Sequence, residues 1–254
     1  MPFKFPFYDL FGWKFYEHTP EIKIIQAMTP SISQKRLDEL SCVLGLDCSK
    51  YQKDINWTLT RAAGLQFAFV KITEGTTGHE DNLYNLKARV LDAQKNGVKI
   101  GYYHFARPGN VNEPEQDASE EAKNVLDHIA FLPKVQLPFV LDIEAYTTET
   151  NLWDNKVDHM NRFITTFLKK MQEQGIAVIL YSYKNFLDVN TAPIFGAYPI
   201  WIAAYLNSPE TALPKIPNGW NDWQIWQFTE KGQIDGYTGE LDLNMMKKDF
   251  FNKF

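Results

Sequence analysis

The amino-acid sequence predicts an α/β fold, an irregular TIM-like β/α barrel with about five β/α units followed by a few antiparallel strands. Between residues 43 and 205, short apolar runs alternate with longer amphipathic stretches, the pattern of parallel strands joined by crossover helices. The runs are apolar on both faces, which is typical of a sheet covered on both sides or of a closed barrel. They are VLGLDCS (43–49), FAFVKIT (67–73), VKIGYYHF (98–105), LPFVLDIE (137–144), AVILYSY (177–183) and YPIWIAAY (198–205).

The stretches between these runs carry helical patterns. Apolar residues recur at spacings of three and four within residues 83–91 and again within residues 163–171. A glycine follows each pattern, at Gly97 and Gly175, where a helix commonly ends. These stretches are therefore predicted to be the helices that cross over between parallel strands.

The pattern changes after residue 205. The segments NDWQIWQFT (221–229), KGQIDGY (231–237) and ELDLNMM (240–246) are short, lie close together and are separated by glycine-containing turns. No helix fits between them, so they are predicted to be hairpin strands that complete the barrel.

Residues 1–40 differ from the rest and are predicted to be an N-terminal extension, separate from a main domain over residues 41–254. The extension holds five of the 18 phenylalanines without a clear period, followed by a polar segment with weak helical spacing. It either packs on the main domain or docks to a delivery partner or a membrane surface. It lacks the continuous apolar segment and cleavage site of a standard secretion signal.

Composition and motifs exclude several classes of function. The net charge is -5 and there is no basic stripe, so nucleic acid is not an expected partner. No apolar run is long enough to span a membrane, and no heptad pattern indicates an oligomer, so a monomer is expected. The sequence contains no phosphate-binding loop, HExxH motif, zinc-type cysteine pair or GxSxG elbow. Cys42 and Cys48 are expected to be buried free thiols.

The most informative motif is Asp-Ile-Glu at the end of the run 137–144. Residues two apart on a strand share a face, so Asp142 and Glu144 are expected to project together. They lie at the carboxyl end of a barrel strand, where such folds place their active sites. Two close carboxylates repel each other, so one keeps its proton to a higher pH and can serve as a general acid. The simpler alternative is that one of them caps the next helix or pairs with a surface cation.

Two further carboxylates occupy similar places. Asp47 follows the first apolar run, and Asp242 lies between two leucines in the last predicted strand. A barrel would bring these strand ends together with Asp142 and Glu144. The alternatives are a turn-forming role for Asp47 and a buried backbone partner for Asp242.

The sequence resembles glycoside hydrolase family 25, the Chalaropsis-type lysozymes. The resemblance begins at GLDCSKYQKDINW and continues through seven further blocks in the order of the family, covering about residues 43–246. These blocks are FVKITEGT (69–76), IGYYHFARP (100–108), PFVLDIE (138–144), VILYSY (178–183), YPIWIAAY (198–205), WQIWQFT (223–229) and GELDLN (239–244). Residues 1–40 lie outside it.

The resemblance implies a role for each of the four carboxylates. Glu144 matches the general acid, Asp142 assists the intermediate, and Asp47 and Asp242 complete the acidic site. It also implies an irregular β/α barrel without metal or cofactor, which cleaves the β-1,4 bond between N-acetylmuramic acid and N-acetylglucosamine in the glycan strands of peptidoglycan. Such an enzyme acts on the cell wall, outside the cytoplasm, and the sequence does not identify its export route.

Several other side chains are candidates for binding the substrate. Aromatic rings often stack on sugars, although packing in the core is an equal alternative for each of them. Glu74 is expected near the site without an assigned role, and His104 is expected to be a core histidine. The aromatic candidates are Tyr103, Tyr181, Trp201, Tyr205 and Trp226.

Two other functions and three mechanisms stay open at this point. The functions are a chitinase-like glucosaminidase and a non-catalytic carbohydrate-binding or scaffold protein on the same barrel. The mechanisms are attack by the N-acetyl group of the substrate with help from Asp142, direct attack by a carboxylate, and inversion by a water activated on Asp47 or Asp142.

Overall fold

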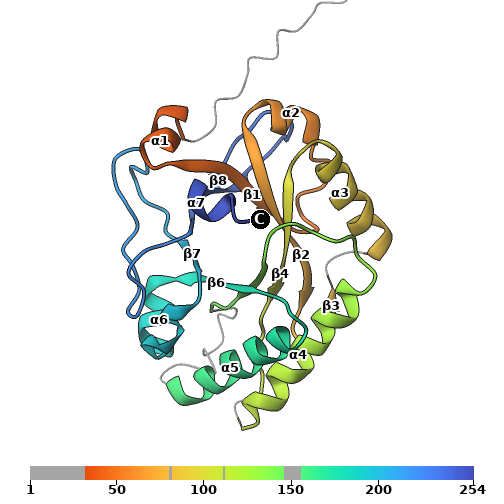
Figure 1. Cartoon of the computed structure of the whole chain (residues 1–254), viewed down its shortest axis with the longest axis vertical. Coiled ribbons are helices and arrows are strands. Elements are labelled where there is room, and N and C mark those ends of the chain that lie inside the picture. The colour runs from red at the N-terminus through yellow and green to blue at the C-terminus, as the bar shows by residue number, and fades with distance from the viewer. Residues whose placement is uncertain (1–31, 80–81, 111, 146–155) are drawn as a thin grey trace, which may run out of the picture.

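A closed barrel of eight strands forms the centre of the protein, as the computed structural model shows for residues 32–79, 82–110, 112–145 and 156–254. The order around the ring is β1-β9-β8-β7-β6-β5-β4-β2, and pairing of β1 with β2 closes it (Figure 1). The predicted irregular β/α barrel is thereby confirmed. The strands are β1 (Cys42–Cys48), β2 (Leu65–Glu74), β3 (Gly78–His79), β4 (Lys99–Phe105), β5 (Phe139–Asp142), β6 (Val178–Tyr183), β7 (Ile200–Ala203), β8 (Ile225–Gly232) and β9 (Leu241–Lys247).

Strand direction shows how the barrel departs from eight-fold regularity. All neighbours from β1 through β2, β4, β5, β6, β7 and β8 are parallel, whereas β9 runs antiparallel to both β8 and β1. The segment 231–237 is not a separate strand, contrary to the sequence prediction, because its first two residues extend β8. Gly232 pairs with Leu241 of β9, which continues β8 to that residue, and Gly236 at φ 101° then allows the chain to turn.

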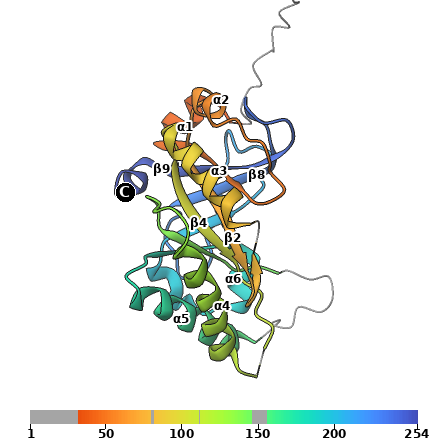
Figure 2. The same cartoon turned by 90° about the vertical axis from the view of Figure 1, so that its right-hand side faces the viewer.

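Helices cover the outside of the ring, where α3, α4, α5 and α6 surround the strands (Figures 1 and 2). Both stretches with a helical period, 83–91 and 163–171, lie inside helices, as predicted. The helices are α1 (Gln34–Glu39), α2 (Trp57–Ala62), α3 (Leu83–Lys95), α4 (Pro114–Ile129), α5 (Val157–Glu173), α6 (Lys184–Asn190), the 3₁₀ helix η1 (Pro193–Ala197) and α7 (Lys248–Phe251).

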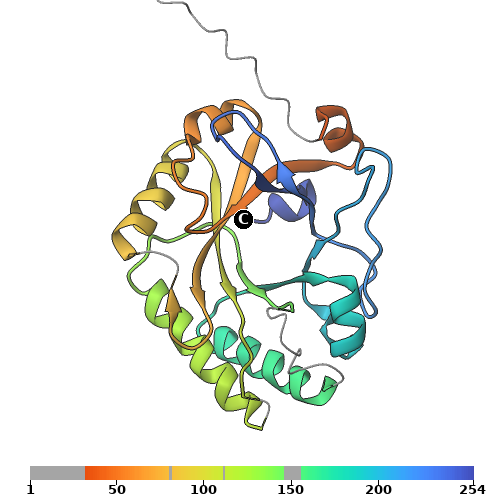
Figure 3. The same cartoon turned by 180° about the vertical axis from the view of Figure 1, so that it is seen from behind.

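The barrel interior is solid at its amino-terminal end. Phe67 and Phe69 of β2 fill it, and Phe250 and Phe251 pack against them from α7, near the chain's C-terminus (Figure 3). Gly45 of β1 leaves room for the rings, since a Cβ there would lie 2.2 Å from Phe67. The interior can therefore hold a cavity only towards the carboxyl ends of the strands.

The first described residues already belong to this fold. Ser33 donates to both carboxylate oxygens of Glu210, and Arg36 donates to the carbonyl of Ala212 at 2.7 Å. The segment 32–40, which the sequence prediction assigned to the extension, thus contacts the main domain, while residues 1–31 lie outside the described residues. Cys42 and Cys48 are buried free thiols, as predicted. Within the described segments, no helix is both long and apolar enough to span a membrane.

Candidate active site

Four carboxylates meet at the end of the barrel where the parallel strands finish and the antiparallel strand β9 begins. Asp47 of β1, Asp142 of β5, Asp242 of β9 and Glu144, two residues beyond β5, line one cavity of about 110 Å³. The cavity thus unites acids that are almost 200 residues apart in sequence. Its other lining residues are Tyr103, Tyr181, Trp201 and Gln227.

Backbone pairing explains this convergence. Asp47 and Asp242 are direct partners across the antiparallel pair β1–β9. Beyond the end of β5, the N–H of Ile143 still donates to the carbonyl of Tyr181 at 3.0 Å, so the chain follows β6 a little further. Asp142 and Glu144 both reach the cavity as a result, as the spacing of two predicted.

Asp47 is the most firmly held of the four acids. Its Oδ2 accepts from Gln227 Nε2 at 2.9 Å and from Asn244 Nδ2 at 2.8 Å. Burial raises the pKa of Asp47 to about 6, although hydrogen bonds from Asn244, Gln227 and Asp242 oppose the increase. Burial, followed by the charge of Asp47, raises the pKa of Asp242 to about 9. Near neutral pH, Asp242 therefore carries a proton and donates it to Asp47.

Asp142 and Glu144 have raised proton affinity as well. Burial and then the charge of Glu144 raise the pKa of Asp142 well above its ordinary value. Burial and then the charge of Asp47 raise the pKa of Glu144 to about 7. Oδ1 of Asp142 is buried and has no hydrogen-bond partner among the described residues. Both acids therefore keep their protons to a higher pH than ordinary carboxyl groups, and Asp142 presents one buried oxygen that no described residue binds.

An aromatic wall faces the acids. The hydroxyls of Tyr181 and Tyr205 both donate to Oε1 of Gln227, each at 2.7 Å, which turns the amide group of Gln227 towards Asp47. Trp201 donates through Nε1 to Oδ1 of Asn244 at 2.8 Å, so it supports the second amide that binds Asp47. Tyr205 does not line the cavity, but it is about half exposed beside it.

Trp226 does not join this site. It is fully buried, and its Nε1 donates to the carbonyl of Ala204 at 2.8 Å. It packs against Trp223 and Phe228 in the layer between barrel and helices. Because neighbouring residues on a strand point to opposite faces, Gln227 faces inward and Trp226 faces outward.

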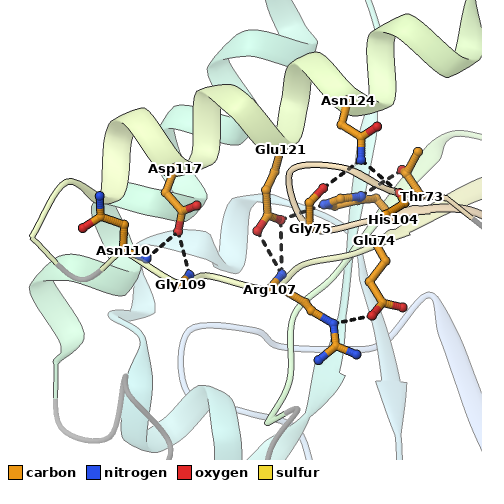
Figure 4. Close-up of polar contacts among 11 residues, drawn as sticks. Thr73, Glu74, Gly75, His104, Arg107, Gly109, Asn110, Asp117, Glu121 and Asn124 are labelled. Carbon is orange, nitrogen blue, oxygen red and sulfur yellow. Dashed lines mark hydrogen bonds and ion pairs between the residues drawn. The ribbon is translucent and has the colours of Figure 1, made fainter.

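Glu74 also lies outside the cavity lining, where it binds two cations. It accepts from Lys71 Nζ at 2.5 Å and from Arg107 Nε (Figure 4). Burial alone would raise the pKa of Glu74, but the ion pairs with Lys71 and Arg107 outweigh it and hold the pKa below its ordinary value. Glu74 thus joins the end of β2 to the loop after β4.

A stripe of polar residues on α4 holds the same two segments from behind (Figure 4). Asp117 accepts from the backbone N–H groups of residues 109 and 110, and Glu121 accepts from the N–H of Arg107 at 3.0 Å. Asn124 donates to the carbonyl of Gly75 at 2.8 Å. The helix therefore fixes two loops at the carboxyl end of the barrel.

His104 is a core histidine, as predicted. Its Nδ1 lies 2.9 Å from Thr73 Oγ1 and its Nε2 lies 2.7 Å from Glu121 Oε2, and both His104 and Glu121 are fully buried. Burial, followed by the charge of Lys71, lowers the pKa of His104 to about 3, and burial raises that of Glu121 well above its ordinary value. The pair is accordingly neutral, with Glu121 donating to Nε2.

Sequence analysis did not single out Lys71, Gln227 or Asn244. A signal existed for Lys71, since it shares a strand face with Phe67 and Phe69 and is the first charge on that face. The two amides gave no signal, because single Gln and Asn residues in strands are common. Within the described residues, no group of three or more His, Cys, Asp or Glu side chains is arranged to hold a metal ion.

A β/α barrel with carboxylates gathered at one end of its strands is an arrangement that glycosidases use. The chain belongs to glycosyl hydrolases family 25, whose family model matches residues 46–237. The resemblance found in the sequence is thus confirmed.

Known relatives agree with this assignment. Lysozyme M1 of Streptomyces globisporus is 29% identical over 210 residues, which are 81% of this chain and 68% of the relative. The N,O-diacetylmuramidase of Chalaropsis sp is 28% identical over 195 residues, 74% of this chain and 88% of the relative. The bacterial lysozyme from Streptomyces coelicolor superimposes with a TM-score of 0.65 at 27% identity, covering 80% of this chain and 91% of its own.

Proposed function

We propose that the protein is a muramidase, which hydrolyses the β-1,4 bond between N-acetylmuramic acid and N-acetylglucosamine in peptidoglycan, with Glu144 as the general acid. The observation that carries the proposal is the convergence of four carboxylates on one cavity, where the pKa of Glu144 is about 7. A carboxyl group with that pKa keeps its proton at the pH where the leaving oxygen needs it. The names of the relatives, lysozyme and N,O-diacetylmuramidase, support the choice of substrate.

In the proposed reaction, Glu144 gives its proton to the glycosidic oxygen while the bond from that oxygen to the anomeric carbon breaks. The carbonyl oxygen of the 2-acetamido group attacks the anomeric carbon from the opposite face and forms a cyclic intermediate. Water then opens the ring, and Glu144 takes a proton from that water. The configuration at the anomeric carbon is retained.

Asp142 supports this route over direct attack by a carboxylate. Its Oδ1 is buried without a partner among the described residues, and an acetamido N–H can supply the missing donor. Accepting that hydrogen bond orients the acetamido group and stabilises the positive charge that develops on it. Identification of the anomer formed first, by NMR, tests the route: an inverted product would instead support a water activated on Asp47 or Asp142.

The pair formed by Asp47 and Asp242 acts on Glu144 through its charge. With one proton between them, the two acids carry about one negative charge near neutral pH, and Asp47 is a cause of the raised pKa of Glu144. We assign this pair the role of keeping Glu144 protonated before substrate binds. Tyr103, Tyr181 and Trp201 form the sugar-facing wall of the cavity, with Tyr205 at its edge.

The deciding experiment compares peptidoglycan digestion by the wild type and by Glu144→Gln, with mass spectrometry of the borohydride-reduced products. Reduced N-acetylmuramic acid ends from the wild type alone support the proposal. The matched control Glu173→Gln changes an exposed acid on α5 and keeps full activity. Reduced N-acetylglucosamine ends would indicate a glucosaminidase, and absence of any release by the wild type would favour a carbohydrate-binding protein.

The setting of the activity follows from its substrate. We propose that the protein acts on the cell wall as a monomer, with residues 41–254 as the catalytic domain. Residues 1–40 are proposed to bind a delivery partner. Deletion of residues 1–31, which leaves the contacts of Ser33 and Arg36 intact, tests this by comparing activity on purified walls with activity on whole cells.

A further inference from the structure

Lys71 brings a positive charge to an otherwise acidic site. The residues that line the cavity include four carboxylates and no lysine or arginine. Lys71 is on β2 in the same face as Phe67 and Phe69, which pack inside the barrel, and its side chain is only 12% exposed. Its ammonium group lies 4.8 Å from the ring centroid of Phe105, and Phe105 pairs with Asp142 on the neighbouring strand.

Glu74 fixes the position of this charge. Its carboxylate accepts from Lys71 at 2.5 Å and from Arg107, while the backbone N–H of Arg107 is held by Glu121 (Figure 4). The side chain of Glu74 is 24% exposed, so both members of the Lys71–Glu74 pair are largely shielded from solvent. Charges at such depth are screened weakly by salt and act over longer distances than surface charges.

We propose that the largely shielded Lys71–Glu74 pair is a two-charge positioning device, which sets the electrostatic field at Asp142 and Glu144 from strand β2. The inference rests on the proposed function, because it concerns the acid of that reaction. Lys71 favours the ionised form of both acids, and Glu74 opposes it at Asp142. Neither residue touches the reacting atoms; both act through the electrostatic field at the cavity.

The charges of Lys71 and Glu74 have opposite effects on the proton affinity of the acids. Lys71 lowers the pKa of both Asp142 and Glu144, while the charge of Glu74 is among the causes that raise the pKa of Asp142. Burial remains the largest cause for both acids, so the device adjusts a proton affinity that the cavity creates. Four other titratable groups line the same cavity: Asp47, Asp242, Tyr103 and Tyr181. Arg107 binds Glu74, the charge of Lys71 acts on His104, and the charge of Glu230 acts on Asp242 and Tyr205.

Because Lys71 and Glu74 carry opposite charges, substitutions of the two residues are expected to have different effects on the two acids. The pH dependence of kcat/KM is measured for Lys71→Met, Glu74→Gln and the double variant. Lys71→Met moves the alkaline limb up by about one pH unit, whereas Glu74→Gln, whose charge acts on Asp142 and not on Glu144, leaves the limb near its wild-type position. The double variant follows Lys71→Met. Lys71→Arg keeps the charge and leaves the limb where it is in the wild type. A purely structural role for Lys71 would reduce activity without moving the limb.

Lys99 provides a matched control at the other end of the barrel. It also lies over an aromatic ring, 4.0 Å from the centroid of Phe251, and donates to the carbonyl of Phe254 at 2.7 Å. Lys99→Met loses stability but keeps the wild-type pH profile. A shift as large as that of Lys71→Met would overturn the proposal.

A second measurement separates this inference from the proposed function. Titration of ¹³C-labelled carboxyl groups by NMR follows Asp142 and Glu144 without any substrate. Raised midpoints of both acids in Lys71→Met and a lowered midpoint of Asp142 in Glu74→Gln support the device even in a protein that releases nothing from peptidoglycan. Unchanged midpoints in both variants overturn it even where the wild type is an active muramidase. If Lys71→Met does not fold, the downward shift of the Asp142 midpoint in Glu74→Gln alone decides whether the device exists.

Discussion

Asp47 and Asp242 are direct partners across the antiparallel strands β1 and β9, and they share a proton inside the barrel. The pair places two acids that are remote in sequence within hydrogen-bond reach of each other. The pair forms because β9 runs antiparallel to its barrel neighbours. Asp242 lies near the start of β9, and the reversed direction places that start level with Asp47 near the end of β1. The irregularity of the barrel is therefore part of how the site is built.

The shared proton makes stability depend on pH. The pKa of Asp242 is raised from 3.8 to about 9, so between these values the folded protein binds a proton that the unfolded chain does not, and stability falls as pH rises. Asp242→Asn keeps a donor for Asp47 and has no proton to lose. Its melting temperature at pH 8 should exceed that of the wild type, by about 2–4 °C for each kcal/mol relieved. Parallel melting curves of the two proteins from pH 4 to 9 would contradict this.

Activity should fall as pH rises through neutrality. As the proposed general acid, Glu144 has to be protonated to act, and its pKa of about 7 places the alkaline limb of kcat/KM near that pH. The charge of Asp47 is a cause of that pKa, so Asp47→Asn should move the limb to lower pH in addition to reducing the rate. The measurement is the pH profile of muropeptide release, and a limb that stays in place in Asp47→Asn would refute the electrostatic coupling.

Packing inside the barrel predicts that one methyl group added at Gly45 lowers the free energy of unfolding. A Cβ at Gly45 would lie 2.2 Å from the ring of Phe67, which is enclosed on all sides. Gly45→Ala should cost about 1–3 kcal/mol of unfolding free energy, measured by chemical denaturation. At Gly109 the nearest atom would lie at 3.6 Å, so Gly109→Ala should stay within about 0.5 kcal/mol. Equal losses in both would show that the ring of Phe67 moves aside.

The protonation of the buried His104–Glu121 pair can be tested by two substitutions of Glu121. Glu121→Ala leaves Nε2 of His104 and the N–H of Arg107 without their partner, and should cost about 2–4 kcal/mol. Glu121→Gln resembles the protonated acid, since it offers both a donor and an acceptor, and should cost much less. A Gln variant as unstable as the Ala variant would mean that the pair is ionised. Thermal denaturation of both variants provides the comparison.

The sequence predicted the barrel and the meeting of its acids from local patterns alone. Asp47, Asp142 and Glu144 end apolar runs, and the topology of a β/α barrel is enough to bring such ends together. Asp242 was found because it lies between Leu241 and Leu243 in the last predicted strand. These predictions needed only the positions at which the strands end, and not which strands are neighbours in the barrel.

Other features of the site depended on which face of a strand each residue occupies, and an apolar run does not reveal this. WQIWQF has large residues on both faces, so its letters do not tell whether Trp226 or Gln227 points inward. The answer comes from pairing with β7 and β9, which places Gln227 beside Asn244 and Asp47. Lys71 carried a signal in its phase with Phe67 and Phe69, and strict alternation within FAFVKIT would have identified it.

The plug of Phe67 and Phe69 closes the inner end of the cavity that the four carboxylates line. A polymer cannot thread through such a hollow, so a glycan strand can enter and leave it only by the one opening. Both new chain ends therefore leave on the same side of the barrel.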